Sequence, residues 1–77
     1  MSDPKKLTVG EYLFKQCSES LLKEMAAHSD YWNSCDAFVN SNRMKLVGDL
    51  SYKQRDWLIR LKEGLLEEMK KVGEHGR

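Results

Sequence analysis

The apolar residues between Ser51 and Gly73 recur at intervals of three and four, and this pattern constrains the fold more than any other feature of the chain. Such spacing places apolar side chains along one face of an α-helix. Ser51 and Gln54 form a capping box, in which each side chain accepts a hydrogen bond from the other residue's backbone N–H, so the helix is expected to begin there. Gly73 suits the first position beyond the helix, and lysines in the last turn are favoured by the helix dipole. The predicted apolar face consists of Leu58, Leu61, Leu65, Met69 and Val72.

The first helix of the chain is predicted at about residues 9–27. Thr8 and Glu11 form a second capping box at its start. After them, apolar side chains recur at every fourth position, which predicts a single stripe along a continuous helix. The stripe consists of Leu13, Cys17, Leu21 and Met25.

A shorter helix is predicted at about residues 30–41, between the two longer ones. Ser29 or Asp30 can cap it, and aromatic and apolar side chains follow at helical spacing. Two glycines further along the chain are expected to have special roles. Gly48 suits a left-handed backbone conformation, and Gly64 is expected to mark a close approach of another helix backbone.

These elements predict an all-α protein, a small three-helix antiparallel bundle. No segment has the alternating pattern of valine, isoleucine and threonine that is typical of strands. We expect one helical domain at residues 8–73, a disordered N-terminal tail at residues 1–7 and a C-terminal tail at residues 74–77. The expected core consists of Leu13, Cys17, Leu21, Met25, Trp32, Phe38, Leu58, Leu61, Leu65 and Met69. Four apolar residues lie off these stripes and are expected either to be buried in a monomer or to form a docking face: Phe14, Leu22, Ile59 and Leu66.

The length and composition of the chain limit the classes of protein to which it can belong. Its 77 residues provide one domain with a modest core. No apolar run reaches the roughly 20 residues that a membrane-spanning helix needs, and the N-terminus lacks the apolar core of a signal peptide. We therefore expect a cytoplasmic protein that does not bind membranes, in which Cys17 and Cys35 stay reduced.

The residues that carry chemistry in other proteins are few and scattered in this one. Cys17, His28 and Cys35 lack the close ligand pairs that structural zinc sites use, so no metal site is predicted. The helix break at Ser29 separates His28 from Cys35, which is unfavourable for a nucleophile and its base. There is no glycine-rich loop of the kind that binds phosphates. We expect a protein without catalytic residues and without cofactors.

Basic residues are concentrated in one part of a nearly neutral chain. The net charge is +1, yet residues 41–62 hold six basic residues against two acidic ones. Such a local excess indicates an interaction surface, and arginine and tryptophan are the residue types that contribute most to many interfaces. The residues expected to contact a partner are Arg55, Arg60 and Trp57, together with Lys53, Lys62 and Arg43.

The segment from Trp32 to Leu61 resembles short helical modules of bacteriophage and DNA-metabolism accessory proteins. The shared pattern is W-x5-F, a variable linker, and then L-S-x-K-Q-x3-L at the start of a leucine-rich helix. In this chain the pattern is carried by Trp32, Phe38, Leu50, Ser51, Lys53, Gln54, Leu58 and Leu61. The resemblance implies a small accessory module that works near nucleic-acid machinery, and it brings no catalytic residues with it.

Three kinds of partner follow from these observations. We expect first an accessory or regulatory protein that docks on a partner protein, in a complex for nucleic-acid processing or host defence in a phage setting. The alternative is direct binding of single-stranded nucleic acid by the basic third helix, with Tyr52 or Trp57 stacked on a base. The third is a homodimer that buries the spare apolar residues.

Overall fold

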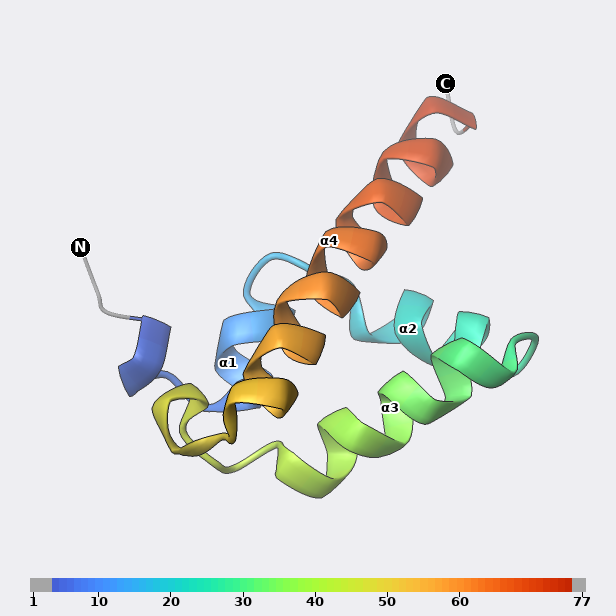
Figure 1. Ribbon diagram of the computed structural model, residues 1–77. Helices are drawn as coiled ribbons and strands as arrows, with labels where there is room; N and C mark the ends of the chain where they lie inside the picture. The colour runs from blue at the N-terminus through green and yellow to red at the C-terminus, as the bar shows by residue number, and fades with distance from the viewer. Residues whose placement is uncertain (1–3, 76–77) are drawn as a thin grey trace.

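The computed structural model describes residues 4–75, and the side chains of residues 5–71. It confirms the predicted all-α fold, in which three main helices pack together and the described residues contain no strand (Figure 1). In chain order the elements are the 3-10 helix η1 (Pro4–Lys6), the helices α1 (Val9–Phe14), α2 (Glu19–Ala26) and α3 (Asp30–Asn42), the 3-10 helix η2 (Val47–Asp49) and the helix α4 (Tyr52–His75).

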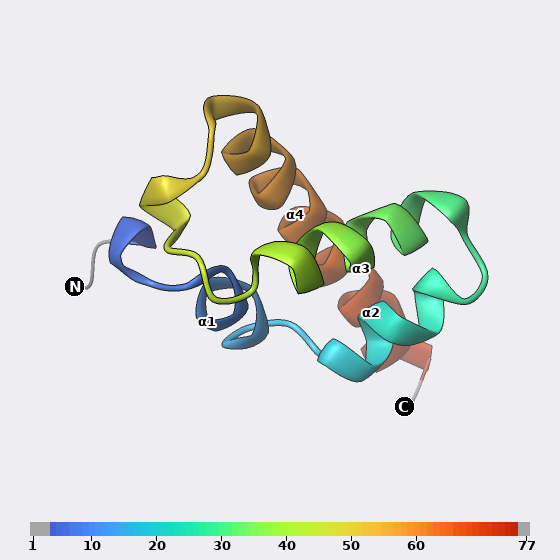
Figure 2. The ribbon, with the colours of Figure 1, turned by 90° about the horizontal axis from the view of Figure 1, so that it is seen from below.

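The long helix α4 spans almost the whole molecule. Its 24 residues extend for about 36 Å, and the molecule measures 38 × 30 × 17 Å. Helices α2 and α3 lie side by side, and α4 crosses behind them when the molecule is seen from below (Figure 2). Because packed helix axes lie about 8–10 Å apart, the short dimension of the molecule holds no more than two layers, with α4 in one and α2 and α3 in the other (Figure 2). One side of α4 is therefore left without a covering element.

The start of α4 is as predicted, but its end is not. The backbone N–H of Gln54 donates to Ser51 Oγ at 3.2 Å, and that of Ser51 donates to Gln54 Oε1 at 3.1 Å. The helix then continues through Gly73 to His75, so the predicted end at Gly73 is wrong. Neither a proline nor a competing cap follows Gly73, and a glycine inside an exposed helix costs only about 1 kcal/mol. Of the expected tail at residues 74–77, the first two residues are helical and the last two lie outside the described residues.

The single first helix predicted over residues 9–27 is wrong, because the chain forms two helices there. The capping box of Thr8 and Glu11 is present at the start of α1, which is only six residues long. Ser18 then interrupts the helix, because its backbone is extended and its Oγ accepts from the N–H of Leu21 at 3.2 Å. Serine is a strong N-cap, and here it begins a second helix instead of continuing the first. In Figure 1, α1 and α2 lie on either side of α4.

The break changes which side chains of α2 are buried. A continuous helix would turn Leu21 and Met25 towards the core, but the structure buries Leu22 and Ala26, and leaves Leu21 and Met25 half-buried. Leu22 is one of the four apolar residues that lay off the predicted stripes, and it has no exposed surface. It is therefore part of the monomer core.

The helix α3 begins and ends close to the predicted positions 30–41. Ser29 caps it, with its Oγ accepting from the N–H of Trp32 at 3.4 Å. Its inner side buries Cys35, Phe38 and Val39, as helical spacing requires. Together with α2 it forms a helical hairpin, the part of the structure with the most extensive local packing.

The N-terminal segment is tied to the connection between α3 and α4. The N–H of Val47 donates to the C=O of Leu7 at 2.8 Å, and the N–H of Val9 donates to the C=O of Lys45 at 2.9 Å. Residues 4–7, expected to belong to a disordered tail, thus form η1 and a docked strand-like segment, while residues 1–3 lie outside the described residues. Gly48 does not have the predicted left-handed conformation. A Cβ there would lie 3.1 Å from both the Cβ and the carbonyl oxygen of Lys5, so glycine is needed for the close contact with η1.

The core lies between α4 and the other helices. Six of the ten predicted core residues are buried: Leu13, Cys17, Phe38, Leu58, Leu61 and Leu65. The other four are half-buried at its edge: Leu21, Met25, Trp32 and Met69. The structure also buries five apolar residues that are absent from the predicted core: Val9, Cys35, Val39, Val47 and Leu50. Gly64 does mark a close contact, but with the indole of Trp32, because a Cβ there would lie 3.0 Å from Trp32 Cη2.

We predict that Leu65→Ala leaves the chain largely unfolded at 25 °C. Leu65 has no exposed surface, and such a truncation costs about 2–5 kcal/mol, which is comparable to the total stability of about 3–5 kcal/mol expected for a domain of this size. Urea titration followed by circular dichroism measures the loss. The exposed Glu67→Ala on the same helix is the control and should change the free energy of unfolding by less than about 0.5 kcal/mol. Equal stability of the two variants would contradict this account of the core.

Candidate interaction surface

The structure does not gather the six predicted partner-binding residues into one site. Four of them contact other elements of the fold: Arg43, Arg55, Trp57 and Lys62. The remaining two, Lys53 and Arg60, are exposed on α4, seven residues apart along one side of the helix. Arg60 also pairs with Asp56 one turn earlier, with 3.1 Å between Arg60 Nε and Asp56 Oδ2.

Arg43 joins three helices at the end of α3. Its guanidinium donates to both carboxylate oxygens of Glu19 at 2.8 and 3.0 Å, and it lies 5.0 Å from the ring centre of Phe14. Its backbone C=O accepts from the N–H of Gly10 at 3.1 Å. A Cβ at Gly10 would lie 3.0 Å from Arg43 Cγ, so the glycine gives the arginine room. A two-pronged arginine–carboxylate pair is rigid, and Arg43 therefore has a structural role in holding α1 and α2 against α3.

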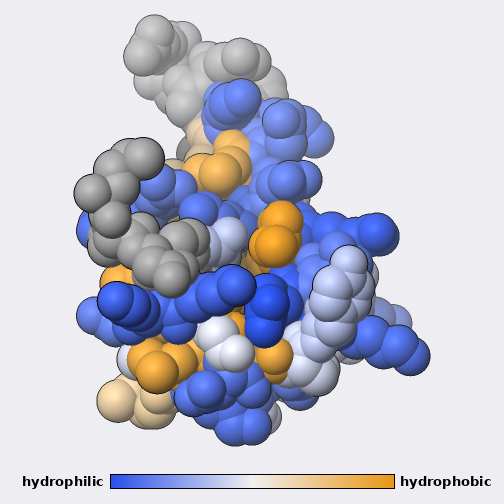
Figure 3. Space-filling view, turned by 60° about the vertical axis from the view of Figure 1, so that its left-hand side comes forward, coloured by the Kyte–Doolittle hydropathy of each residue, from blue (hydrophilic) through white to orange (hydrophobic). Residues whose placement is uncertain are grey.

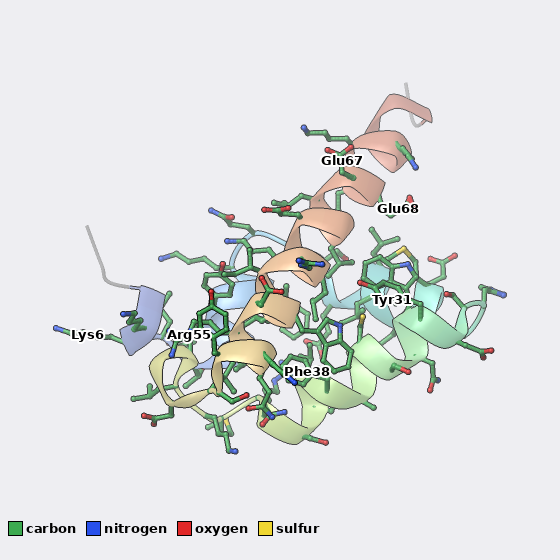
Figure 4. The ribbon with its side chains drawn as sticks, in the orientation of Figure 1. Lys6, Tyr31, Phe38, Arg55, Glu67 and Glu68 are labelled. Atoms are coloured by element: carbon green, nitrogen blue, oxygen red, sulfur yellow. The ribbon has the colours of Figure 1, made fainter. Side chains whose placement is uncertain are left out.

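Arg55 is directed at the connection that precedes α4 (Figure 4). Its Nη2 donates to the backbone C=O of Gly48 and of Leu50, each at 3.3 Å. Its Nε is buried and has no hydrogen-bond partner. The side chain is thus partly enclosed by its own chain, although it keeps its positive charge at the edge of α4.

The other two inward-turned residues contact aromatic rings. Trp57 stacks on Phe38 of α3, with 4.5 Å between ring centres and 22° between ring planes. The ammonium of Lys62 lies 4.2 Å from the ring centre of Tyr12 on α1. These contacts attach α4 to α3 on one side and to α1 on the other. The residue types alone do not reveal this structural role.

The uncovered side of α4 instead carries a row of apolar side chains spaced by seven residues. Tyr52 is 85% exposed and Ile59 is 42% exposed, and Leu66 is half-buried. We call these three residues the outer stripe. Seven residues are close to two helical turns, so their side chains follow one line along the helix. The sequence indicated part of this stripe, because Ile59 and Leu66 lie off the predicted core face. The seven-residue spacing that adds Tyr52 to them was not recognised.

Charged side chains border the outer stripe, with a different sign on each side. Asp56 and Glu63 stand three residues before and four after Ile59, which places both on one side of it by about 40–60°. Arg55 and Lys62 stand four before and three after Ile59, on the opposite side. One border of the stripe is therefore acidic and the other is basic.

Two hollows lie on the surface away from the outer stripe. One runs between α1 and the end of α3 and is lined by Leu7, Phe14, Lys15, Arg43 and Met44. The side chain of Met44 stands in solvent, 83% exposed. The other lies at the corner of α2 and α3 and is lined by Leu21, Met25, His28, Trp32 and Glu68. Both are open, shallow grooves, so neither encloses a small molecule.

On the face drawn in Figure 3, the apolar surface is divided into separate areas. Figure 3 shows apolar patches interrupted by hydrophilic side chains on the face that it presents. A surface of this kind is typical of protein–protein interfaces in which a few apolar anchor residues are surrounded by charged ones.

The cysteines are placed for packing. Cys17 and Cys35 are free and buried, and burial raises the pKa of both thiols, so they stay protonated at neutral pH. Within residues 4–75, no three His, Cys, Asp or Glu side chains are grouped so that they could hold a metal ion. Over the same residues, no helix combines the length and the apolar character required to cross a membrane.

Comparison with protein-family models, curated proteins and solved structures finds no match to this chain.

We predict that the Arg43–Glu19 pair makes the stability depend on pH. The hydrogen bonds from Arg43 hold the pKa of the Glu19 carboxyl below its ordinary value. A lowered pKa in the folded state means that the stabilisation is complete above the ordinary glutamate pKa and is lost as the pH falls from that value through the lowered pKa. Glu19→Gln should melt at a lower temperature than the native chain at pH 7 and should lose less stability over that interval.

Thermal melts followed by circular dichroism test this prediction, with Glu67→Gln as the control. The control removes an exposed carboxylate of α4 and should keep the pH profile of the native chain. Parallel profiles for the native chain and Glu19→Gln would show that the ion pair contributes nothing measurable.

Proposed function

We propose that this chain is a small non-catalytic accessory or regulatory protein that acts in the cytoplasm by docking on a partner protein through the uncovered side of α4. The observation that carries the proposal is the outer stripe. A nearly fully exposed tyrosine and a half-exposed isoleucine, aligned on a rigid helix and bordered by charges, match the way in which partner helices and grooves are recognised.

The proposed contact element is still α4, as in the prediction from the sequence, but the residues proposed to anchor the partner are different. Tyr52 and Ile59 are available to a partner, whereas Trp57 and Arg43 are engaged within the chain. Lys53 and Arg60 lie at the edge of the surface, where exposed charges affect the rate of association and its salt dependence more than its strength. Arg55 and Lys62 contribute their charge to the basic border.

The partner class follows from the resemblance of residues 32–61 to accessory modules of bacteriophage and DNA metabolism. We propose partners in complexes that process nucleic acid or act in host defence in a phage setting. The hollows lined by the described residues are open grooves, which suits a protein that occupies or bridges a partner's surface.

A second candidate is direct binding of single-stranded nucleic acid. Lys53, Arg60 and Lys71 are exposed along one side of α4, and Tyr52 beside them presents a free ring on which a base could stack. The acidic residues between them weaken this candidate, since Asp56 already pairs with Arg60 and Glu68 lies 3.8 Å from Lys71.

We predict that Ile59→Lys abolishes capture of a partner protein from the native host, because it places a charge in the middle of the outer stripe. The measurement is a pull-down with mass spectrometry, with and without nuclease. Glu67→Lys is the matched control, since it also adds an exposed lysine to α4 but lies outside the stripe. A partner that survives nuclease and is retained by Glu67→Lys supports docking through the stripe. Recovery of the same partner by Ile59→Lys would contradict it.

Salt separates the second candidate from the first. If Lys53, Arg60 and Lys71 contact phosphates, the affinity for a single-stranded oligonucleotide should fall with a log–log slope of about −2 in salt concentration, at about −0.7 per contact. Fluorescence anisotropy with a labelled oligonucleotide measures the slope. In this case Glu67→Lys should bind more tightly than the native chain. Absence of binding at low salt would remove this candidate.

A further inference from the structure

The outer stripe and its borders repeat with a period of seven residues. Tyr52, Ile59 and Leu66 occupy the same position in successive heptads. The pairs Arg55–Asp56 and Lys62–Glu63 occupy the two flanking positions on either side of Ile59, and the next heptad has Met69 and Lys70 there. A coiled coil has two apolar positions in each heptad, whereas this side of α4 has one, so a helix that pairs with it makes a narrow apolar contact bordered by charges. Tyr52 and Ile59 are exposed on this side, whereas Leu66 also packs against the core. Arg55 and Lys62 at its border contact Gly48 and Tyr12 of the same chain.

The sign of the charges decides which helix fits this side. A partner helix must present basic groups to Asp56 and Glu63, and acidic groups to Arg55 and Lys62, because like charges directly opposite one another oppose association. The adjacent, oppositely charged residues at each heptad give α4 itself that arrangement.

We infer that the outer stripe is covered by α4 of a second copy of this chain, with the two helices parallel and in register. A two-fold axis along the helices places the acidic border of one copy against the basic border of the other. Asp56 then faces Arg55 of the second copy, and Glu63 faces Lys62. Ile59 meets its own counterpart at the centre, with Tyr52 and Leu66 in the layers on either side. This inference rests on the proposed function, since it names the occupant of the same docking surface.

The antiparallel alternative is disfavoured by the same charges. In an antiparallel pair the two-fold axis is perpendicular to the helices. The acidic border of one copy then faces the acidic border of the other, and the basic border faces the basic border. Asp56 would then face Glu63 of the second copy, and Arg55 would face Lys62.

The free end of α4 provides room for the pairing. Glu67 and Glu68 lie on the part of the helix that extends past α1 and α3 (Figure 4). In this part the stripe residue Leu66 and the neighbouring Met69 both keep exposed surface. Two copies thus form a short two-helix contact with three apolar layers, so a weak and concentration-dependent dimer is expected.

Sedimentation equilibrium of the full chain, from low micromolar to millimolar concentration, tests the inference. The native chain should pass from monomer to dimer over this interval. Ile59→Lys should raise the dissociation constant of the dimer about tenfold or more, because it removes the central layer. Glu67→Ala, an exposed change outside the stripe and its borders, should leave the constant unchanged, and circular dichroism should show that each variant is folded.

A charge exchange tests the parallel orientation. Lys62→Glu and Glu63→Lys should each weaken the dimer, since each places like charges across the contact, and an equimolar mixture of the two variants should dimerise more strongly than either alone. In an antiparallel dimer neither single variant should be weaker than the native chain, because each replaces a like-charged contact. That result would overturn the parallel arrangement.

The outcomes also distinguish this inference from the proposed function. A native chain that stays monomeric at millimolar concentration overturns self-pairing. If that monomer still captures a host protein and Ile59→Lys does not, the stripe belongs to a different partner and the proposed docking function stands. If neither dimer nor partner depends on Ile59, both are wrong.

Discussion

Burial of the inner leucines of α4 is the constraint on which the rest of the structure depends. Leu58, Leu61 and Leu65 have no exposed surface, and each neighbouring helix contacts α4 near them. Trp57 stacks on Phe38 of α3, Lys62 lies over Tyr12 of α1, and the Sγ of Cys17 lies 4.0 Å from the backbone oxygen of Lys62. A chain of 77 residues has few other ways to remove enough apolar surface from water. Because the inner side of α4 is committed to this role, its opposite side is the part left for partners.

The elements that the sequence predicted well are those governed by local chemistry. The capping boxes at Thr8 and Ser51 are both present, because a side chain and a backbone N–H three residues apart meet wherever a helix begins. The interruption at Ser18 was not predicted, since the apolar residues on either side of it happen to keep a spacing of four. A serine between two such residues fits equally well as an exposed helical position or as a new cap. Only packing against α4 decides between them.

The candidate surface was harder to predict than the fold, for a physical reason. Arginine, lysine and tryptophan have long apolar portions that pack well inside a domain, so their presence does not distinguish an interface from a core. Arg43 and Trp57 show this, because one joins three helices through Glu19 and Phe14 and the other stacks on Phe38. The exposed tyrosine and isoleucine of the outer stripe are more informative. Their exposure, however, depends on which side of α4 the other helices cover, and that is a tertiary property.

The pairing of residues 7–10 with residues 43–47 has a consequence for the order in which the chain folds. The C=O of Leu7 accepts a hydrogen bond from the N–H of Val47, which lies some forty positions later in the chain. Helices α2 and α3, in contrast, pack against each other across a short turn. Closing the longer loop costs more entropy, so the helical hairpin can assemble first and the beginning of the chain can dock only afterwards. Residues 7–10 are thus expected to reach their native positions after the helical hairpin that follows them in the chain.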